Sequence, residues 1–224
     1  MVKAKDLYKS YGKNEVLKGA SIEASPGTIT ALVGRNGCGK STMLQILAGT
    51  LKADKSSICF FGNDVSKDKS VFSKYVGYVP QDNPLFEELS VSDNLQFWAA
   101  GSKNVDKSII DKFELKELLK TKVRDLSGGM KRRLTIACTL QRTPPVLLLD
   151  EPTSSLDLYY QLSISNIMKD FVSHGGTIIM STHNEHEIVL SDVIYLFEDG
   201  KTTRILKDAL DMNDIRRSFL IQDK

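Results

Sequence analysis

The sequence predicts an α/β fold built around a mostly parallel β-sheet, and two observations lead to this prediction. Short apolar runs recur along the chain, and segments with helical spacing separate them. Such continuous runs are typical of parallel strands that are covered by helices on both faces. Residues 82–140 instead form a largely helical block, so we expect one domain over 1–224, with a core at about 1–81 and 141–224 and an inserted helical lobe at about 82–140.

The N-terminal part of the chain contains three strand candidates and one helix candidate. The predicted strands are the apolar runs 28–34, 57–62 and 75–80. Residues 41–51 (STMLQILAGTL) have apolar side chains at helical spacing, which predicts a helix directly after the first of these strands.

The helical block carries recognisable start signals. Ser90 and Asp93 have the spacing of a capping box, which predicts that a helix begins there. The amphipathic segment 112–120 predicts a second helix. Ser127 is a suitable N-cap for a third helix, although two glycines follow it, each of which costs about 1 kcal/mol relative to alanine inside a helix.

The C-terminal part returns to alternating strands and helices. The predicted strands are 146–150, 177–181 and 193–197, and the predicted helices are 158–173 and 184–190. Residues 198–201 (EDGK) contain Asp-Gly, a strong hairpin signal, so the chain should turn back on itself there.

Composition and charge exclude several protein classes. The three cysteines are too few and too odd in number for a disulfide framework, which favours a reducing compartment. The net charge is +2 and the one notable basic run is 131–133, so no nucleic-acid partner is expected. No stretch approaches the ~18 apolar residues of a membrane span, and a role at a membrane would therefore need another chain to cross the bilayer.

Residues 34–42 (GRNGCGKST) match the phosphate-loop pattern G-x-x-x-x-G-K-[ST] between a predicted strand and a predicted helix. Backbone N–H groups of such a loop and the helix N-terminus attract phosphates. Lys40 would reach the β- and γ-phosphates, and the Ser41 hydroxyl would bind Mg²⁺. The loop residues predicted to contact the nucleotide are Gly34, Asn36, Gly37, Cys38, Gly39, Lys40, Ser41 and Thr42.

Two acidic residues end the predicted strand 146–150. Asp150 can help to hold Mg²⁺ through its second shell, and Glu151 can polarise a water molecule as a general base. No N-K-x-D sequence is present to read guanine, so ATP is favoured over GTP.

Six features then occur in a characteristic order along the chain: Lys40-Ser41, Gln81, LSGG at 126–129, LLLDE at 147–151, SSLD at 154–157, and His183. This order resembles the nucleotide-binding subunit of ABC transporters over about residues 1–205. The resemblance implies a P-loop NTPase core with a mostly parallel sheet, an antiparallel β edge subdomain and an inserted helical lobe. It also implies a head-to-tail dimer, in which the γ-phosphate held by one subunit meets Ser127, Gly128 and Gly129 of the other.

The resemblance assigns further roles residue by residue. Tyr11 would stack on adenine, with Tyr8 as an alternative, although either tyrosine can also be an ordinary half-buried strand residue. Gln81 would sense Mg²⁺ and the attacking water, and His183 would contact the γ-phosphate. Asp157 would couple the two sites, unless it is only a helix N-cap. The implied catalytic residues are Glu151, His183, Gln81 and Lys40, and the implied metal-binding residues are Ser41, Gln81 and Asp150.

Two positions call for separate interpretations. Met130 stands where the commonest family motif has glutamine, so position 130 is not expected to be a polar nucleotide contact. Residues 127–134 (SGGMKRRL) resemble the branch with drug and antibiotic exporters and some lipid transporters. Cys38 lies beside a helix N-terminus and Lys40, which should lower its thiol pKa, so we expect ATP-protected alkylation there; the alternative is a small buried apolar residue.

These features together predict an ATPase that works with ATP and Mg²⁺. Its expected partners are a second ATPase subunit and an integral membrane permease, which places it at the cytoplasmic face of the membrane. The alternative is a related ATPase in nucleic-acid repair or translation, although the chain has neither a long heptad insert nor a second phosphate loop. A membrane partner could dock on an apolar groove of the helical lobe, unless the same side chains form the core of the lobe: Phe86, Leu89, Phe97 and Trp98.

Overall fold

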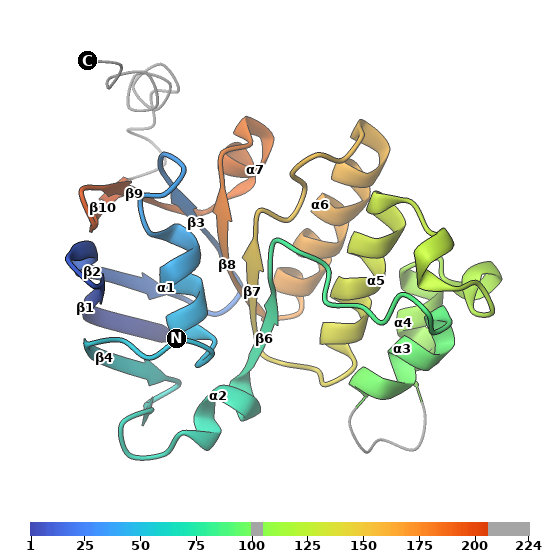
Figure 1. Cartoon of the computed structure of the whole chain (residues 1–224), viewed down its shortest axis with the longest axis horizontal. Coiled ribbons are helices and arrows are strands. Elements are labelled where there is room, and N and C mark those ends of the chain that lie inside the picture. The colour runs from blue at the N-terminus through green and yellow to red at the C-terminus, as the bar shows by residue number, and fades with distance from the viewer. Residues whose placement is uncertain (100–104, 206–224) are drawn as a thin grey trace.

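A six-stranded sheet lies at the centre of the molecule (Figure 1). The computed structural model describes residues 1–99 and 105–205; residues 100–104 and 206–224, which fall within the predicted domain 1–224, lie outside the described residues. The strands are, in order across the sheet, β10 (Lys201–Ile205), β9 (Val193–Glu198), β3 (Ile29–Val33), β8 (Thr177–Thr182), β7 (Val146–Asp150) and β6 (Val76–Val79). All neighbours pair in parallel except β9 and β10, which form the hairpin predicted at 198–201.

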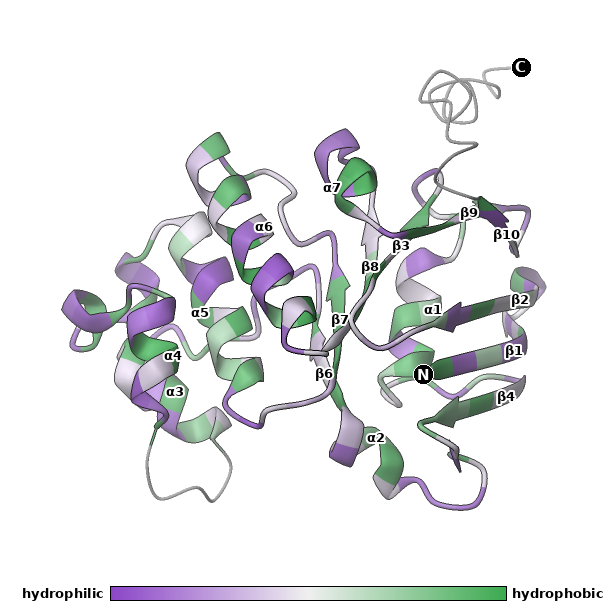
Figure 2. Ribbon diagram, turned by 180° about the vertical axis from the view of Figure 1, so that it is seen from behind, coloured by the Kyte–Doolittle hydropathy of each residue, from purple (hydrophilic) through white to green (hydrophobic). Residues whose placement is uncertain are grey.

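The central strands have continuous apolar sequences because each of them faces two hydrophobic cores. On β7, Leu147 and Leu149 belong to one buried cluster, and Val146 and Leu148 belong to the other. The ribbon coloured by hydropathy shows β7 as hydrophobic along its length, whereas the helices beside it carry both kinds of residue (Figure 2). The prediction of a mostly parallel sheet covered on both faces is confirmed.

A second, fully antiparallel sheet packs at one end of the molecule. Its strands are, in order, β2 (Asn14–Ala24), β1 (Val2–Tyr11), β4 (Lys55–Phe60) and β5 (Asn63–Asp64). Helix α1 (Lys40–Leu47) lies between the two sheets, because Met43, Leu44 and Leu47 share a buried cluster with Leu17 of β2 and Leu148 of β7. This sheet is the antiparallel edge subdomain that the family resemblance implies.

The local pattern did not locate β1 and β2, although β2 carries a usable signal. Ala20 and Ile22 are buried on β2 and alternate with more exposed residues, which is the period of a half-buried strand. On β1 the alternation breaks at Asp6, which has a left-handed φ of 51°, and the pairing with β2 shifts register between Ala4 and Leu7. A bulge of this kind hides a strand from any search for strict alternation.

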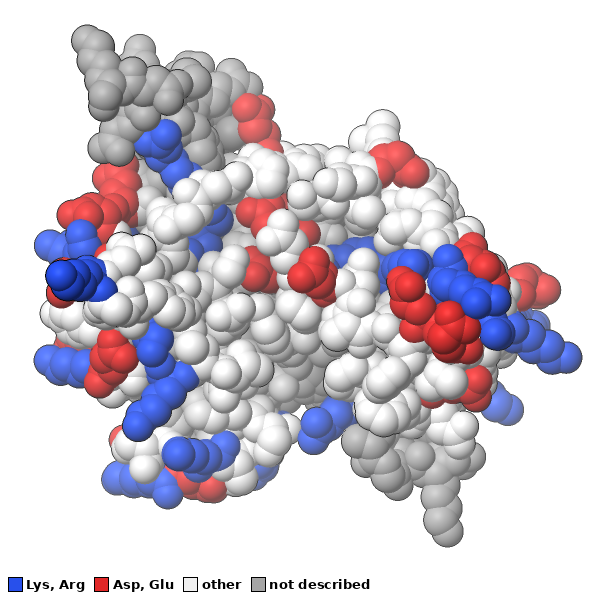
Figure 3. All heavy atoms as spheres, in the orientation of Figure 1, with Lys and Arg blue, Asp and Glu red and all other residues white. Residues whose placement is uncertain are grey.

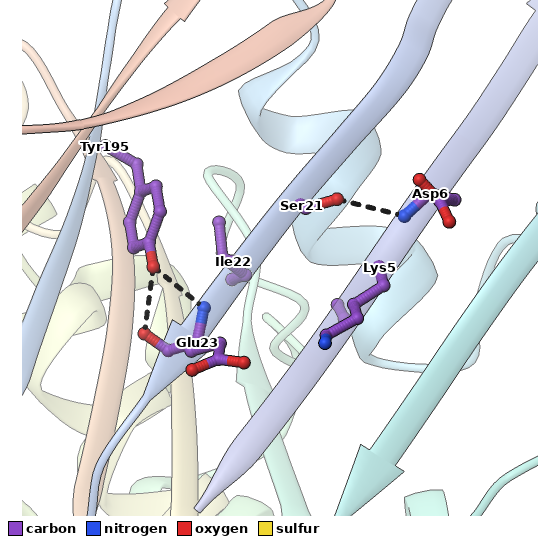
Figure 4. A pocket seen from close by; sticks show the side chains of 7 residues that line it. Lys5, Asp6, Ser21, Ile22, Glu23 and Tyr195 are labelled. Carbon is purple, nitrogen blue, oxygen red and sulfur yellow. Dashed lines mark hydrogen bonds between the residues drawn. The ribbon is translucent and has the colours of Figure 1, made fainter.

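Hydrogen bonds from side chains join the two sheets around a small cavity of about 210 Å³ (Figure 4). The Tyr195 hydroxyl of β9 accepts a bond from the backbone N–H of Glu23 at 3.0 Å and donates one to the carbonyl of the same residue at 3.4 Å. On the neighbouring strands, the backbone N–H of Asp6 donates to the Ser21 hydroxyl at 3.0 Å. The two Tyr195 bonds fix β2 relative to the central sheet, whereas the Asp6–Ser21 bond joins β1 to β2 within the antiparallel sheet.

Three of the remaining helices gather at the end of the molecule opposite the antiparallel sheet (Figure 1). Those three, α3 (Val91–Trp98), α4 (Lys107–Lys112) and α5 (Gly128–Leu140), form the helical lobe. The others are α2 (Ser70–Tyr75), α6 (Leu158–Ser173) and α7 (Glu185–Leu190). Within the described part of the chain, no helix is both long and apolar enough to cross a bilayer.

Two predicted helix starts are confirmed by their hydrogen bonds. The backbone N–H of Asp93 donates to the Ser90 hydroxyl at 3.1 Å, and the backbone N–H of Ser90 donates to the Asp93 carboxylate at 3.2 Å, which completes a capping box. The Ser127 hydroxyl accepts from the backbone N–H of Met130 at 3.3 Å.

The helix predicted at 112–120 is wrong. Helix α4 ends at Lys112, and Glu114 adopts a left-handed φ of 50°, after which only a short 3₁₀ turn forms at Lys116–Leu118. Phe113 and Leu115 are both buried in the core of the lobe, on either side of this break. The amphipathic pattern was therefore real, but a turn rather than a helix brings its apolar side chains to the core.

Candidate active site

The predicted phosphate loop joins β3 to α1 and is organised around Lys40. The Lys40 side chain is buried, and its ammonium group donates to the carbonyls of Gly34 at 2.7 Å and Arg35 at 3.0 Å. The loop thus curls around the amine and holds it at the mouth of α1. A cation fixed at a helix N-terminus, where backbone N–H groups also point outward, forms a strong anion site.

Glycine is required in this loop for reasons that the geometry makes plain. Gly37 and Gly39 have φ values of 80° and 112°, which side-chain-bearing residues rarely adopt. At Gly39 a Cβ would also lie 2.9 Å from the Leu17 side chain and 3.2 Å from the Val16 carbonyl of β2. The antiparallel sheet therefore supports the loop from behind.

A cavity of about 420 Å³ opens above the loop and brings together residues that are far apart in the sequence. It is lined by nine residues of the predicted site, namely Asn36, Gly37, Gly39, Lys40, Ser41, Thr42, Gln81, Glu151 and His183. Val16 and Ser154 also line it and were not predicted, although Ser154 lies within the SSLD segment quoted for Asp157. Eight other predicted residues do not line this cavity: Tyr11, Gly34, Cys38, Ser127, Gly128, Gly129, Asp150 and Asp157.

Asp150 lies just below the cavity, where β7 ends. Its carboxylate accepts hydrogen bonds from the Ser41 hydroxyl at 3.0 Å and the Ser181 hydroxyl at 2.5 Å. The Tyr78 hydroxyl lies 3.5 Å from the other carboxylate oxygen, and burial together with Asp150 raises the pKa of Tyr78. A hydroxyl and a carboxylate held side by side fit Mg²⁺, which binds one or two protein oxygens and completes its shell with phosphate and water.

Glu151 and His183 form a pair at the ends of two adjacent strands. His183 Nδ1 lies 2.8 Å from a carboxylate oxygen of Glu151, and the side chains are 52% and 10% exposed, respectively. Glu151 has a left-handed φ of 49°, and its backbone N–H donates to the Ser181 hydroxyl at 3.0 Å. The backbone turn lets the chain place a carboxylate and an imidazole together at the cavity wall.

Comparison with known proteins identifies the family. A sequence model of the ABC transporter family matches residues 17–154. The chain belongs to the ABC transporter family. It is 35% identical over 205 residues to the lantibiotic transport ATP-binding protein SrtF of Streptococcus pyogenes, over 90% of this chain and 88% of the relative. It is 31% identical over 213 residues to the linearmycin resistance ATP-binding protein LnrL of Bacillus subtilis, over 92% of this chain and 68% of the relative.

A solved structure gives the same answer for the fold. An ATP-binding cassette in a dimeric, post-hydrolysis state bound to ADP and Pi superposes with a TM-score of 0.82 at 25% identity, over 92% of this chain and 99% of that one. The predicted P-loop NTPase fold and the predicted ATPase activity of an ABC protein are thus confirmed. The Lys40 loop and the cavity-lining residues Gln81 and Glu151 lie within the residues 17–154 that match this family.

The two glycines of the ABC signature sequence have different surroundings. At Gly129 a Cβ would lie 2.3 to 2.4 Å from the Tyr160 ring of α6, so this glycine lets α5 pack against α6 within one chain. At Gly128 a Cβ would meet no atom within 4 Å, and both Ser127 and Gly128 are exposed. Packing inside the chain therefore explains Gly129 but not Gly128.

Three other predicted contacts of the ABC ATPase lie outside the Lys40 cavity. Tyr11 is half exposed at the end of β1, and its ring centroid lies 5.5 Å from Lys9 Nζ. Tyr8 instead packs its ring against Gly19 of β2, which leaves Tyr11 the freer of the two. Asp157 is the N-cap of α6 and accepts from the backbone N–H of Tyr160 at 3.1 Å. Stacking by Tyr11 and coupling by Asp157 stay predictions.

The expectation of a lowered thiol pKa at Cys38 is wrong. Burial raises the pKa of Cys38 above its ordinary value, and this effect outweighs the opposing influence of Lys40 and of backbone hydrogen bonds. Cys38 also packs beneath the loop, 3.0 Å from where a Cβ on Gly34 would lie. Met130 likewise packs against the hydrophobic core, in keeping with its apolar side chain.

Two buried charged residues near the site were not singled out from the sequence. Glu187 of α7 accepts hydrogen bonds from the Thr153 hydroxyl at 2.7 Å and from the Thr182 hydroxyl, and burial raises the pKa of its carboxyl group. It thereby joins the segment after Glu151 to the segment before His183. The second is Arg132, which belongs to the basic run 131–133 and is buried.

Proposed function

We propose that this chain is the ATP-hydrolysing subunit of an exporter, which dimerises head-to-tail on ATP and drives transport through a separate membrane subunit. One observation supports the dimer: Ser127 and Gly128 are exposed at the start of α5 and lie outside the cavity that contains Lys40. A single chain thus holds two complementary half-sites, and a second copy or a related chain would supply the missing half. Residues 1–224 are proposed to form one ABC ATPase domain, with a core at about 1–81 and 141–224 and a helical lobe at about 82–140.

Hydrolysis is proposed to proceed by in-line attack of water on the γ-phosphate. Glu151 accepts the proton of the attacking water while the bond from the γ-phosphorus to the β–γ bridging oxygen breaks and ADP leaves. His183 holds the Glu151 carboxylate at 2.8 Å and faces the same cavity. Lys40 and the backbone amides of the partner's signature helix neutralise charge on the phosphates.

Ser41, Gln81 and Asp150 are the residues that we propose hold Mg²⁺ with the nucleotide. Ser41 and Gln81 line the cavity, and Asp150 is hydrogen-bonded to Ser41. When bound, Mg²⁺ would neutralise negative charge that develops on the β- and γ-phosphate oxygens.

The membrane partner is proposed to dock on the helical lobe. Phe86, Leu89 and Phe97 are 43%, 40% and 57% exposed, and the rings of Phe86 and Phe97 lie 4.6 Å apart. Trp98 behaves differently and packs against the hydrophobic core. The four residues that the sequence grouped together thus divide into an exposed apolar trio and one partly buried residue that packs against the core. The trio is a suitable docking surface for an apolar helix.

The relatives support export and a place at the cytoplasmic face of the membrane. The proteins SrtF and LnrL are named for lantibiotic transport and linearmycin resistance, respectively. On the face shown in Figure 3, basic and acidic side chains are intermixed at both ends, and acidic side chains lie among uncharged ones near the centre, so that face shows no continuous basic tract for a nucleic acid. Transport is therefore favoured over a role in nucleic-acid repair or translation.

Mixed dimers test the head-to-tail arrangement. Lys40→Ala and Gly128→Asp should each abolish hydrolysis alone, but their heterodimer retains one intact site, so the mixture should hydrolyse ATP faster than either variant. Lys40→Ala mixed with Glu151→Gln is the matched control, because both sites of that heterodimer are damaged and no recovery is expected. Recovery in neither mixture, or in both, would contradict a site shared between subunits.

A further inference from the structure

Arg132, on the second turn of α5, is bonded to four backbone carbonyls and is only 3% exposed. Its Nε donates to the Pro152 carbonyl at 3.1 Å, and Nη2 donates to the Asp150 carbonyl at 2.6 Å. Its Nη1 donates to the carbonyls of Pro80 and Gln81, the latter at 3.3 Å. One guanidinium group therefore holds the residues on both sides of Glu151 and the backbone of Gln81.

The chemistry of these contacts depends on the shape of arginine. Burial lowers the pKa of Arg132 to about 10, and the carboxylates of Asp150 and Glu187 oppose this shift, so the group stays charged at neutral pH. A planar guanidinium presents donors in several fixed directions, whereas a lysine ammonium is a compact charge that cannot reach four carbonyls from two segments. Buried carbonyls that lose a donor are costly and tend to move toward another partner.

Two other side chains of α5 form hydrogen bonds with the stretch of chain that follows Gln81. The Thr135 hydroxyl donates to the Asn83 side chain at 3.1 Å, and Lys131 Nζ donates to the Glu87 carboxylate at 2.7 Å. The stretch after Gln81 is therefore fastened to α5, whose N-terminus carries Gly128. A displacement of α5 would therefore shift Gln81 through this stretch and Glu151 through Arg132.

We propose that Arg132 is a positioning residue that couples the Gln81 segment to the Glu151 segment through α5. An anion bound at the start of α5 would thereby set the placement of both side chains in the same chain's ATP site. This inference rests on the proposed function, because it takes Glu151 as the base, but it adds a route by which the signature helix controls that base.

Arg133 is a matched control in the next position of the same helix. It is also buried, at 6% exposed, and its guanidinium donates to the Phe113 carbonyl and to the Glu114 carboxylate at 2.9 Å. Both partners belong to the helical lobe, and neither adjoins Gln81 or Glu151. Arg133→Lys thus repeats the chemical change of Arg132→Lys without touching the two catalytic segments.

The test compares ATP hydrolysis and unfolding in the two variants. Arg132→Lys should lower kcat by roughly 10²-fold with little change in KM, because a misplaced base slows the chemical step more than it weakens binding. Arg133→Lys should leave kcat within about threefold of the value for the unmodified protein. This change is much smaller than the loss of kcat expected when a catalytic group is displaced. Equal losses of kcat in the two variants, or a loss that merely follows a lower unfolding temperature, would overturn the proposal.

A double variant separates this inference from the assignment of Glu151. If Arg132 acts through Glu151, Arg132→Lys should lower kcat much less in the Glu151→Gln variant than it does in the unmodified protein. If the fold-losses of kcat of the two single variants instead multiply in the double variant, Arg132 does not act through the base. A fully active Glu151→Gln would instead refute the proposed base, whatever Arg132→Lys does on its own.

Discussion

At the scale of single residues, the carboxylate of Glu151 is positioned by contacts on several sides. Its backbone N–H is bonded to Ser181, its side chain meets His183, and its neighbours Asp150 and Pro152 are bonded to Arg132. A left-handed φ at a residue other than glycine costs of order 1 kcal/mol, so these contacts must offset that strain. The placement of this side chain is thus a product of its surroundings.

Glu151→Gln should bind ATP, hydrolyse it about 10²- to 10⁴-fold more slowly, and accumulate as the ATP-bound dimer. Glutamine fills the same space but cannot accept the proton from water. Phosphate release and size-exclusion chromatography with ATP measure the two effects. The exposed Glu117→Gln serves as control and should behave like the unmodified protein; a fully active Glu151→Gln enzyme removes the residue from its catalytic role.

At the scale of secondary-structure elements, α5 combines an exposed N-terminus with a body that is packed into the molecule. Its start is exposed at Gly128, its second residue packs against Tyr160 of α6, and Arg132 reaches into the core. The glycines that weaken the helix start are therefore tolerated because tertiary packing stabilises the rest of the helix. Ser127, as N-cap, offsets part of their cost.

Alanine at the two signature glycines should separate stability from function. Gly129→Ala forces the Tyr160 ring to move and should lower the free energy of unfolding by about 1–3 kcal/mol, as overpacking does. Gly128→Ala should keep or slightly raise stability, since alanine favours a helix by about 1 kcal/mol over glycine. Urea unfolding measures the first effect, and ATP-dependent dimerisation measures the loss that we expect for Gly128→Ala. The assignment fails if Gly128→Ala dimerises normally.

At the scale of the whole molecule, the antiparallel sheet and the helical lobe lie at opposite ends of the central sheet (Figure 1). The cavity above the Lys40 loop is lined by Val16 of the antiparallel sheet and by Gln81, which lies on the segment that leads to the lobe. The exposed trio at Phe86, Leu89 and Phe97 lies on the lobe, beyond Gln81. A partner seated on the trio would therefore lie a short stretch of chain away from the ATP site.

Phe97→Asp should weaken co-purification with the membrane subunit while leaving ATP hydrolysis by the isolated chain unchanged. The charge falls in the exposed trio, where it would oppose an apolar partner without disturbing the core. Trp98→Asp is the contrasting variant and should destabilise the lobe, because Trp98 is partly buried and packs against the hydrophobic core. Detergent extraction followed by affinity purification measures how much membrane subunit is recovered with each variant. Unchanged recovery with Phe97→Asp would rule out this docking site.

Much of the fold could be read from local pattern because the central strands are apolar on both faces. The runs at 146–150 and 177–181 fall on β7 and β8 almost to the residue. The pattern failed where the chain departs from regular geometry, at the bulge of Asp6 in β1 and at the left-handed Glu114 after α4. A single residue with positive φ changes the direction of the chain without leaving a periodic signal.

The sequence by itself determined the family and singled out the candidate site residues, because a phosphate loop and an acidic strand end require particular residue types at fixed spacing. Only the tertiary structure decided which groups meet. It placed His183 against Glu151, packed Gly129 but not Gly128 against a neighbouring helix, and reversed the expected pKa shift of Cys38. It also placed the Arg132 guanidinium between the segments of Gln81 and Glu151. These outcomes depend on burial and on contacts between distant segments, and neither is encoded in the spacing of neighbouring residues.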